Sequence, residues 1–376
     1  MDFSLNEEQQ LLKDSVDRFV RENYGLADRR KLVASPDGFG PDNWRIMAEL
    51  GWLGAALPEA YGGTGGGPVE TMVIMEGFGR GLVVEPYIAS VVLGGNLILQ
   101  GGTDAARREI LPLLAEGRIQ LAFGFAERQS RYDMFDVETK AAKSGSGYLL
   151  SGHKGVVLHG GGADKIVVSA RTAGARRDKA GITLFLVDAD ARGVSRRAYQ
   201  TVDGLRAAEV TLENVEAPAD AVIGSVDGGM PLIDDAARRG IAALAAEAVG
   251  IMDTMQSLTN DYLKTRQQFG RPLGKFQALQ HRMVDILIAC EESRSAALIA
   301  TLRLDDEDAS RRDKAVAAAK VKIGQSGRFI GQSAIQLHGG MGMTDEMQIS
   351  HYFKRLTMID LMFGDHAYHL KRYPAL

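Results

Sequence analysis

The feature that most constrains this chain is a long stretch of helical composition in its C-terminal half. It begins at Pro231, reads PLIDDAARRGIAALAAEAVGIMDTMQSLTNDYLKTRQQ, and contains no proline after its first residue. Its many Ala, Leu and Met residues favour one unusually long helix. Similar patterns follow at 276–304, 311–337 and 346–362, and Ser310 is a candidate N-cap for the second of these. Because long helices with short connections bury their apolar faces against one another, the sequence predicts a C-terminal four-helix bundle.

In the rest of the chain the sequence pattern changes once, from helical to β-type. Residues up to about 118 are helical in pattern, with a capping box formed by Ser4 and Glu7 and further helices expected at 41–50, 69–79, 84–100 and 104–116. Short β-type runs such as GITLFLV then follow one another to about residue 225. We therefore predict an α+β multidomain fold: a helical N-terminal domain (1–118), a β-barrel middle domain (119–227) and the bundle (228–376).

Composition excludes several classes of function. The chain has 376 residues with a formal net charge of -4, so no basic surface for nucleic acid is expected. No apolar run is long enough to cross a bilayer, and the N-terminus MDFSLNEEQQ is unlike a targeting peptide. The single cysteine, Cys290, fits a reducing compartment, so we expect a cytoplasmic protein.

A metal site is not expected either. His338, His351, His366 and His369 are spread over the last helical segments, without a neighbouring cysteine or the H-E-x-x-H spacing of zinc proteases. The glycine-rich stretch YGGTGGG (61–67) lacks the lysine of a phosphate-binding P-loop, and HGGG (159–162) lacks a nucleophile elbow. Both are typical of turns.

Two other stretches are more informative. The first, RQQFGRPLGKFQ, begins with Arg266 where the long helix ends, and Phe276 and Gln277 start the next helix. A cation at such a corner can bind a phosphate or can simply cap the helix. The second, QLHGGMG, carries Gln336, Gly339 and Gly340. Glycines there allow close approach to a ligand, or end a helix.

Within a helical, β, then helical chain, these two stretches resemble the acyl-CoA dehydrogenase family over almost the whole sequence. The resemblance implies an FAD-dependent flavoprotein that oxidises acyl-CoA thioesters to 2-enoyl-CoA, with electron-transfer flavoprotein as the acceptor. It also implies a dimer or tetramer in which each chain binds the ADP half of a neighbour's FAD. The residues that match this ADP-binding set are Arg266, Gln268, Phe269, Phe276, Gln277, Gln336, Gly339 and Gly340.

The positions that contact the flavin ring in the family depart from its pattern. The stretch AERQSRYD (126–133) has Ala126 at the family's threonine position, Arg128 at its proline position and Tyr132 at its serine position. In HKGVVLHG the chain keeps Lys154, but Val156 and Leu158 stand where the family has tryptophan and threonine. An unpartnered polar edge of a buried ring costs about 1–3 kcal/mol, so the ring is bound differently here or by another chain.

The catalytic base is also altered. The family's glutamate aligns with Gly364 or, after one inserted residue, with Asp365, and an alternative base position falls on Gly240. Asp365 is therefore the one candidate base, and it would need an apolar setting that raises its pKa. It could equally be the N-cap of the segment HAYHLKR.

Two versions of the function remain open. The chain is either a self-sufficient homo-oligomeric dehydrogenase with Asp365 as base, or one subunit of a hetero-oligomer whose partner holds the flavin ring. The ends of the chain resemble the small subunits of dehydrogenases for pimeloyl-CoA and for steroid-type acyl-CoA, which favours the second version and a role in fatty acid or steroid side-chain catabolism. A non-catalytic relative and an oxidase of the same fold are further alternatives, and the acyl group is not fixed.

Overall fold

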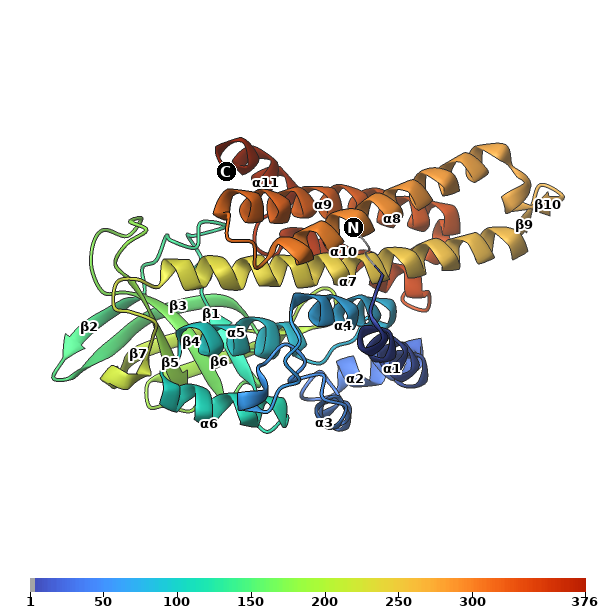
Figure 1. Cartoon of the computed structure of the whole chain (residues 1–376). Helices are drawn as coiled ribbons and strands as arrows, with labels where there is room; N and C mark the ends of the chain where they lie inside the picture. Colours follow the sequence, from blue (N-terminus) through green and yellow to red (C-terminus); the bar gives the residue numbers. More distant parts are fainter. Residues whose placement is uncertain (1–3) are drawn as a thin grey trace. The chain divides into compact units, whose positions relative to one another are not determined.

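The computed structural model of the protein describes residues 4–376, and these form two compact units built from separate stretches of the chain (Figure 1). Unit 1 contains the described residues up to Lys31 together with Pro68–Val83 and Ile241–Leu376. Unit 2 contains Leu32–Gly67 and Val84–Gly240. The order of helices, then strands, then helices along the chain confirms the predicted fold class.

Unit 1 is helical. Its helices are α1 (Glu7–Asn23), α4 (Pro68–Gly81), α8 (Gln277–Arg303), α9 (Ala309–His338), α10 (Gln348–Leu361), α11 (His366–Arg372) and the part of α7 (Met230–Thr265) from Ile241 onward; α2 (Leu26–Ala34) crosses the division. The bundle helices predicted at 276–304, 311–337 and 346–362 are confirmed to within two residues at each end. The buried face of α9 is rich in Ala and Gly, whereas that of α10 carries larger side chains such as Ile349, Tyr352 and Leu356.

Two glycines allow α4 and α7 to cross closely. A Cβ atom on Gly79 would lie 2.0 Å from the carbonyl oxygen of Glu247, and one on Gly250 would lie 1.9 Å from that of Glu76. These distances leave no room for a side chain at either position, so the two backbones are in direct contact. The contact anchors α4, which is far from α7 in the sequence, within unit 1.

Two predicted helix caps were wrong by two residues. Asn6, not Ser4, is the N-cap of α1, because its side chain accepts a hydrogen bond from the backbone N–H of Gln9 while the Gln9 side chain returns to the backbone of Asn6. At α9 the N-cap is Asp308, whose carboxylate accepts from the N–H groups of Ser310 and Arg311. In both cases a side chain with a better-placed acceptor stood nearby.

Unit 2 is built on a mixed sheet. Its strands are β1 (Leu121–Gly124), β2 (Lys140–Ser144), β3 (Gly147–Leu158), β4 (Lys165–Arg171), β5 (Ile182–Asp188), β6 (Val194–Gln200), β7 (Arg206–Ala217) and β8 (Val222–Ile223). They follow the order β6-β7-β3-β2-β4-β5-β8, with β1 paired to β4 in parallel. The core between them is formed by alternating residues such as Leu150, Phe185 and Val210. The domain predicted as a β-barrel is thus a mixed sheet whose path of paired strands ends at β6 and β8.

The helices of unit 2 are α3 (Pro41–Glu49), α5 (Asn96–Gly101), α6 (Asp104–Ala115) and η2 (Ile88–Gly95), which is a π-helix. The prediction of one regular helix over 84–100 was therefore wrong. Gly94 and Gly95 bring the η2 backbone against Leu121 and Leu114, where a Cβ atom would overlap those side chains. The wider turn of a π-helix accommodates this contact.

Candidate cofactor site

The stretch RQQFGRPLGKFQ forms a short hairpin beyond the end of α7. Strands β9 (Gln267–Gln268) and β10 (Arg271–Pro272) pair antiparallel, with Gln268 opposite Arg271. The two residues at the tip, Phe269 and Gly270, both have positive φ (55° and 78°), the conformation of a tight hairpin turn that matches strand twist. The hairpin therefore holds Phe269 outward, 86% exposed.

Aromatic and cationic side chains surround this hairpin. The Phe276 ring, at the start of α8, lies 6.0 Å from the Phe269 ring, edge to face, and the Arg271 guanidinium carbon lies 4.2 Å from the Phe276 ring centre. Arg266 is exposed, and among the described residues no carboxylate pairs with it. It is consequently available to an external anion.

The second motif lies at the end of α9. Gln336 is exposed in the last turn, and Gly339 ends the helix with a φ of 62°. A Cβ atom on Gly339 or on Gly340 would meet no described heavy atom within 4 Å, so the backbone here is open to a ligand.

An aromatic contact brings the two motifs together. The Tyr262 ring, one turn before Arg266, stacks on the His338 imidazole with centroids 4.4 Å apart, and the Tyr262 hydroxyl donates to the His338 carbonyl oxygen at 3.4 Å. His338 is buried, and this burial lowers the pKa of its imidazole. The sequence analysis did not single out Tyr262, because an aromatic residue near a helix end carries no specific signal.

The assembled surface has the chemistry that the ADP half of FAD requires. Arg266 offers a free cation for a phosphate, the two open glycines permit close backbone approach, and exposed Phe269 offers a face for stacking. The amides that can orient the nucleotide are Gln268, Gln277 and Gln336, all exposed. The chain's own residues therefore fit this half of the cofactor.

The positions in unit 2 that match the family's flavin-ring contacts, here called the ring-side positions, lack the polar side chains of the family pattern. Val156 is 51% exposed at a positive φ of 51°, and Leu158 ends β3 with a side chain that offers no hydrogen bond. Tyr132 is covered by the Arg131 guanidinium at 5.4 Å, and the Ala126 carbonyl accepts from the N–H of Gly155 at 2.9 Å. Ser130 turns its hydroxyl to the backbone of Glu127 instead of outward. The threonine, serine and indole contacts of the family pattern are absent from these positions.

Asp365 is the N-cap of α11 in the structure. Its carboxylate accepts a hydrogen bond from the Tyr368 backbone N–H at 2.8 Å, as the N-cap interpretation predicts. The segment before it is held by α9, because the buried Lys320 ammonium donates to the carbonyl oxygens of Ile359 (2.5 Å) and Asp360 (2.8 Å) at the end of α10. Burial lowers the Lys320 pKa to about 8. Lys320 thus supplies the bonds that the last turn of α10 lacks.

The neighbouring Gly364 has no space for a side chain. Its φ is 99°, and a Cβ atom would lie 2.4 Å from the Tyr368 ring and 2.9 Å from Nε2 of His369. The His369 Nε2 atom lies 2.9 Å from the Phe363 carbonyl oxygen, and burial lowers the His369 pKa to about 4. The alignment of the base without an insertion, on Gly364, therefore places it where this chain accommodates no carboxylate. Gly240, the other alternative position, is buried within α7.

No group of three or more His, Cys, Asp or Glu side chains suitable for a metal ion occurs among residues 4–376. None of the helices in this part of the chain has both the length and the apolar character needed to span a bilayer.

Comparison with known proteins agrees with this architecture. Family models of the acyl-CoA dehydrogenase N-terminal, middle and C-terminal domains match residues 6–118, 122–215 and 227–373. The chain belongs to the acyl-CoA dehydrogenase family. It is accordingly an oxidoreductase that acts on acyl-CoA, and FAD is the cofactor of its family.

Similar solved structures include two that are named as pairs. A variant of the "Tcur3481-Tcur3483 steroid ACAD" superposes with a TM-score of 0.89 at 31% identity, covering 99% of this chain and 98% of the other. The ChsE4-ChsE5 complex from Mycobacterium tuberculosis superposes with a TM-score of 0.90 at 26% identity, covering 100% and 98%. The probable acyl-CoA dehydrogenase YngJ of Bacillus subtilis is 28% identical over 369 residues, 97% of this chain and 96% of YngJ.

Proposed function

We propose that this chain is one subunit of a hetero-oligomeric acyl-CoA dehydrogenase that converts an acyl-CoA thioester to the 2-enoyl-CoA. The observation that carries the proposal is a contrast within the chain. The ADP-side residues of unit 1 are complete, exposed and gathered at one place, whereas the ring-side positions of unit 2 have lost their polar contacts. A chain of this kind supplies one half of a cofactor site and needs a second chain for the other half.

In this proposal the chain's own residues bind and orient the ADP half of FAD. Arg266 holds a phosphate of FAD, the backbone beside Gly339 and Gly340 lies against the nucleotide, and Gln277 and Gln336 orient it. FAD, when bound, supplies the acceptor for the hydride from the β-carbon. A partner subunit supplies the ring contacts and the glutamate that removes the α-proton, while Asp365 remains a helix cap.

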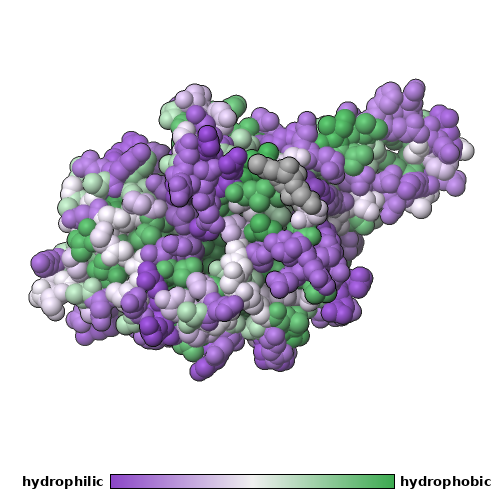
Figure 2. All heavy atoms as spheres, viewed as in Figure 1, coloured by the Kyte–Doolittle hydropathy of each residue, from purple (hydrophilic) through white to green (hydrophobic). Residues whose placement is uncertain are grey.

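A surface for such a partner is present on α8. Five of its apolar side chains are roughly half exposed at helical spacing: Val284, Leu287, Ile288, Ile299 and Leu302. Figure 2 shows apolar side chains exposed in the region where Figure 1 draws α8. Apolar groups repeated along one exposed helix are typical of a subunit contact.

The names of the two similar structures support a second, different subunit and a bulky substrate for this chain. Two of them name pairs, Tcur3481-Tcur3483 and ChsE4-ChsE5, and the first is called a steroid enzyme. We therefore infer a steroid-type or pimeloyl-type acyl-CoA as substrate, and electron-transfer flavoprotein as acceptor. The single cysteine supports the cytoplasm as the compartment.

The runner-up is a homo-oligomer that carries a full FAD per chain and uses Asp365 as base. It is favoured by the position of Asp365 next to the family's glutamate position, and opposed by the ring-side losses. A non-catalytic relative would have no use for the complete ADP-side set. These versions differ in how much flavin each chain binds.

The deciding experiment is the flavin content of purified complexes. The chain is expressed alone and together with an acyl-CoA dehydrogenase subunit that has the usual threonine, serine and tryptophan. We expect little flavin alone and one FAD per pair of chains in the complex. One FAD per chain in a homo-oligomer would overturn the proposal in favour of the runner-up, and a colourless complex would favour the non-catalytic version.

A further inference from the structure

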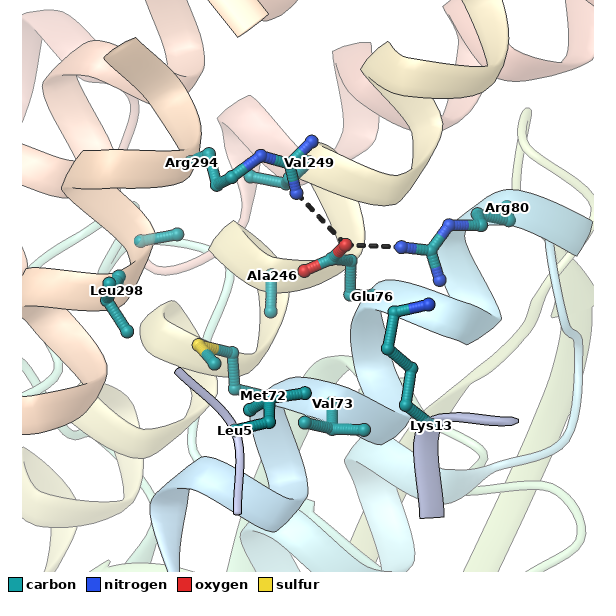
Figure 3. Close-up of a pocket in the computed structure, with 11 residues that line it drawn as sticks. Leu5, Lys13, Met72, Val73, Glu76, Arg80, Ala246, Val249, Arg294 and Leu298 are labelled. Atoms are coloured by element: carbon teal, nitrogen blue, oxygen red, sulfur yellow. Dashed lines mark hydrogen bonds and ion pairs between the residues drawn. The ribbon is translucent and has the colours of Figure 1, made fainter. Parts of the chain in front are cut away.

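A separate pocket lies inside unit 1, between α1, α4, α7 and α8 (Figure 3). Its volume is about 220 Å³. One wall is apolar and includes Met72, Ala246, Val249 and Leu298. The pocket reaches α8 at Arg294, 17 residues beyond Gln277 and so about 25 Å along the helix from the candidate cofactor surface. It therefore belongs to a different part of unit 1.

The opposite wall carries a carboxylate between two cations. Oε1 of Glu76 accepts from Nη1 of Arg294 at 3.1 Å and also from Arg80. Each guanidinium group also pairs with a second carboxylate. Arg294 donates to the Asp253 carboxylate at 2.6 and 2.7 Å, and Arg80 donates to Asp17 at 2.7 Å. The two guanidinium groups therefore face three carboxylates, and the Lys13 ammonium, which lines the pocket and pairs with Asp17, supplies the third positive charge.

The second carboxylate oxygen of Glu76, Oε2, differs from the paired groups just described. Among residues 4–376 no hydrogen bond reaches Oε2, although the Glu76 side chain is only 18% exposed. Figure 3 shows this oxygen turned away from both arginines, toward Ala246 and the apolar wall. The pocket thus combines an apolar wall with one carboxylate oxygen that is open to a hydrogen-bond donor.

We propose that this pocket binds a small, neutral, mainly apolar molecule with one hydroxyl donor, such as a phenol or a cyclic alcohol. The hydroxyl donates to Oε2 of Glu76 while the ring lies against the apolar wall. A neutral donor fits better than an ammonium ion, because Arg80, Arg294 and Lys13 already balance the three carboxylates. The size also fits, since a dry cavity of about 150 Å³ binds benzene.

The direct test is binding of 4-fluorophenol to the full-length chain in its purified oligomer, followed by ¹⁹F NMR. The full chain includes residues 1–3, which lie outside the described part. Comparison with 4-fluoroanisole, which has a similar ring but no donor, isolates the contribution of the hydroxyl. We expect saturable binding of the phenol and about tenfold weaker binding of the anisole, the effect of one hydrogen bond. The absence of saturable phenol binding would overturn the proposal.

Glu76→Gln provides a sharper readout. The amide oxygen remains with the two guanidinium groups, and the amide nitrogen, a donor, then faces the pocket. The preference for the phenol should therefore disappear, because the oxygen of 4-fluorophenol and that of 4-fluoroanisole can each accept a hydrogen bond from that nitrogen. An unchanged preference would show that Oε2 is not the recognition point.

Filling the pocket is the second arm. Ala297 is 3% exposed and lines the pocket, so Ala297→Leu should reduce phenol binding at least about tenfold. Ala318→Leu, the same exchange at an exposed position of α9, is the matched control and should leave binding unchanged. Equal affinity in Ala297→Leu and the control would contradict the site, and the Glu76→Gln arm remains decisive should Ala297→Leu fail to fold.

Discussion

Nζ of Lys154 lies 2.6 Å from Oε1 of Glu127, and the two side chains are 0% and 3% exposed. Lys154 also donates to Oγ of Ser169 at 3.0 Å, and the Glu127 carboxylate accepts from the backbone N–H groups of Glu138 and Thr139. This ion pair therefore connects β3 and β4 to the loop that follows β1. The loop carries Ala126 and Tyr132, two of the altered ring-side positions, so the ion pair holds the segment on which they lie.

Removing one member of this pair should be strongly destabilising. Lys154→Met leaves the Glu127 carboxylate buried without its cation, which should cost about 3–5 kcal/mol of unfolding free energy. The double variant with Glu127→Gln removes both charges and should recover a large part of that loss. Urea denaturation of the three proteins measures the difference, and equal losses in the single and the double variant would show that the two charges are not coupled.

The same pair predicts loss of stability in acid. Burial alone would raise the pKa of Glu127, but the Lys154 charge and the hydrogen bonds to its carboxylate lower it to about 2. Because the folded value lies below the unfolded one, the unfolded chain binds more protons between about pH 4.5 and pH 2, so stability falls as the pH falls through this window. The double variant should show a shallower decline when unfolding is followed from pH 6 to pH 2.

Arg266 and Gln336 can be tested through flavin content. Arg266→Ala removes a charge-assisted phosphate contact and should weaken flavin binding by about 1.5–3 kcal/mol in the assembled oligomer. Gln336→Ala should also lower the flavin content. Arg303→Ala, at the other end of α8 and 46% exposed, is the control and should retain its flavin. Full retention of flavin in both test variants would refute the ADP-side assignment.

Asp365→Asn separates a helix cap from a catalytic base. Asparagine caps a helix about as well as aspartate, so a cap predicts almost no change in melting temperature or in flavin reduction by substrate, whereas Asp365→Ala should cost about 0.5–2 kcal/mol. An amide does not accept the α-proton at neutral pH. A loss of several orders of magnitude in flavin reduction, with normal flavin content and stability, would identify Asp365 as the base after all.

The turn at Gly364 should reject any side chain. Gly364→Ala combines a positive φ with overlap against Tyr368, so we expect a loss of several kcal/mol. Gly145→Ala is a matched control, since Gly145 has a φ of 57° but open space around it, and it should cost only about 1 kcal/mol. Similar melting temperatures for the two variants would mean that the turn rearranges to make room.

The sequence predicted the bundle helices well because their apolar periodicity is long and uninterrupted. It predicted the N-caps less well. Ser4 and Asn6 both carry acceptors, and only the folded backbone shows that the Asn6 side chain is the one that accepts from the Gln9 N–H. The π-helix was not predicted, because it depends on contacts of Gly94 and Gly95 with residues elsewhere in unit 2. Likewise, spacing alone did not show that the ends of α7 and α9 come together through Tyr262 and His338, or that Glu127 and Lys154 pair. Such contacts between distant segments leave no local pattern.

The crowded turn at Gly364 also has an evolutionary consequence. In an ordinary lost active site, one point mutation restores the missing acid. Here the space beside Gly364 is taken by Tyr368 and His369, and the backbone has a conformation that suits glycine. A carboxylate at this position would have to arise together with changes at both neighbours, each of which has a structural role of its own. The turn therefore opposes restoration of an acid at this position by any single substitution.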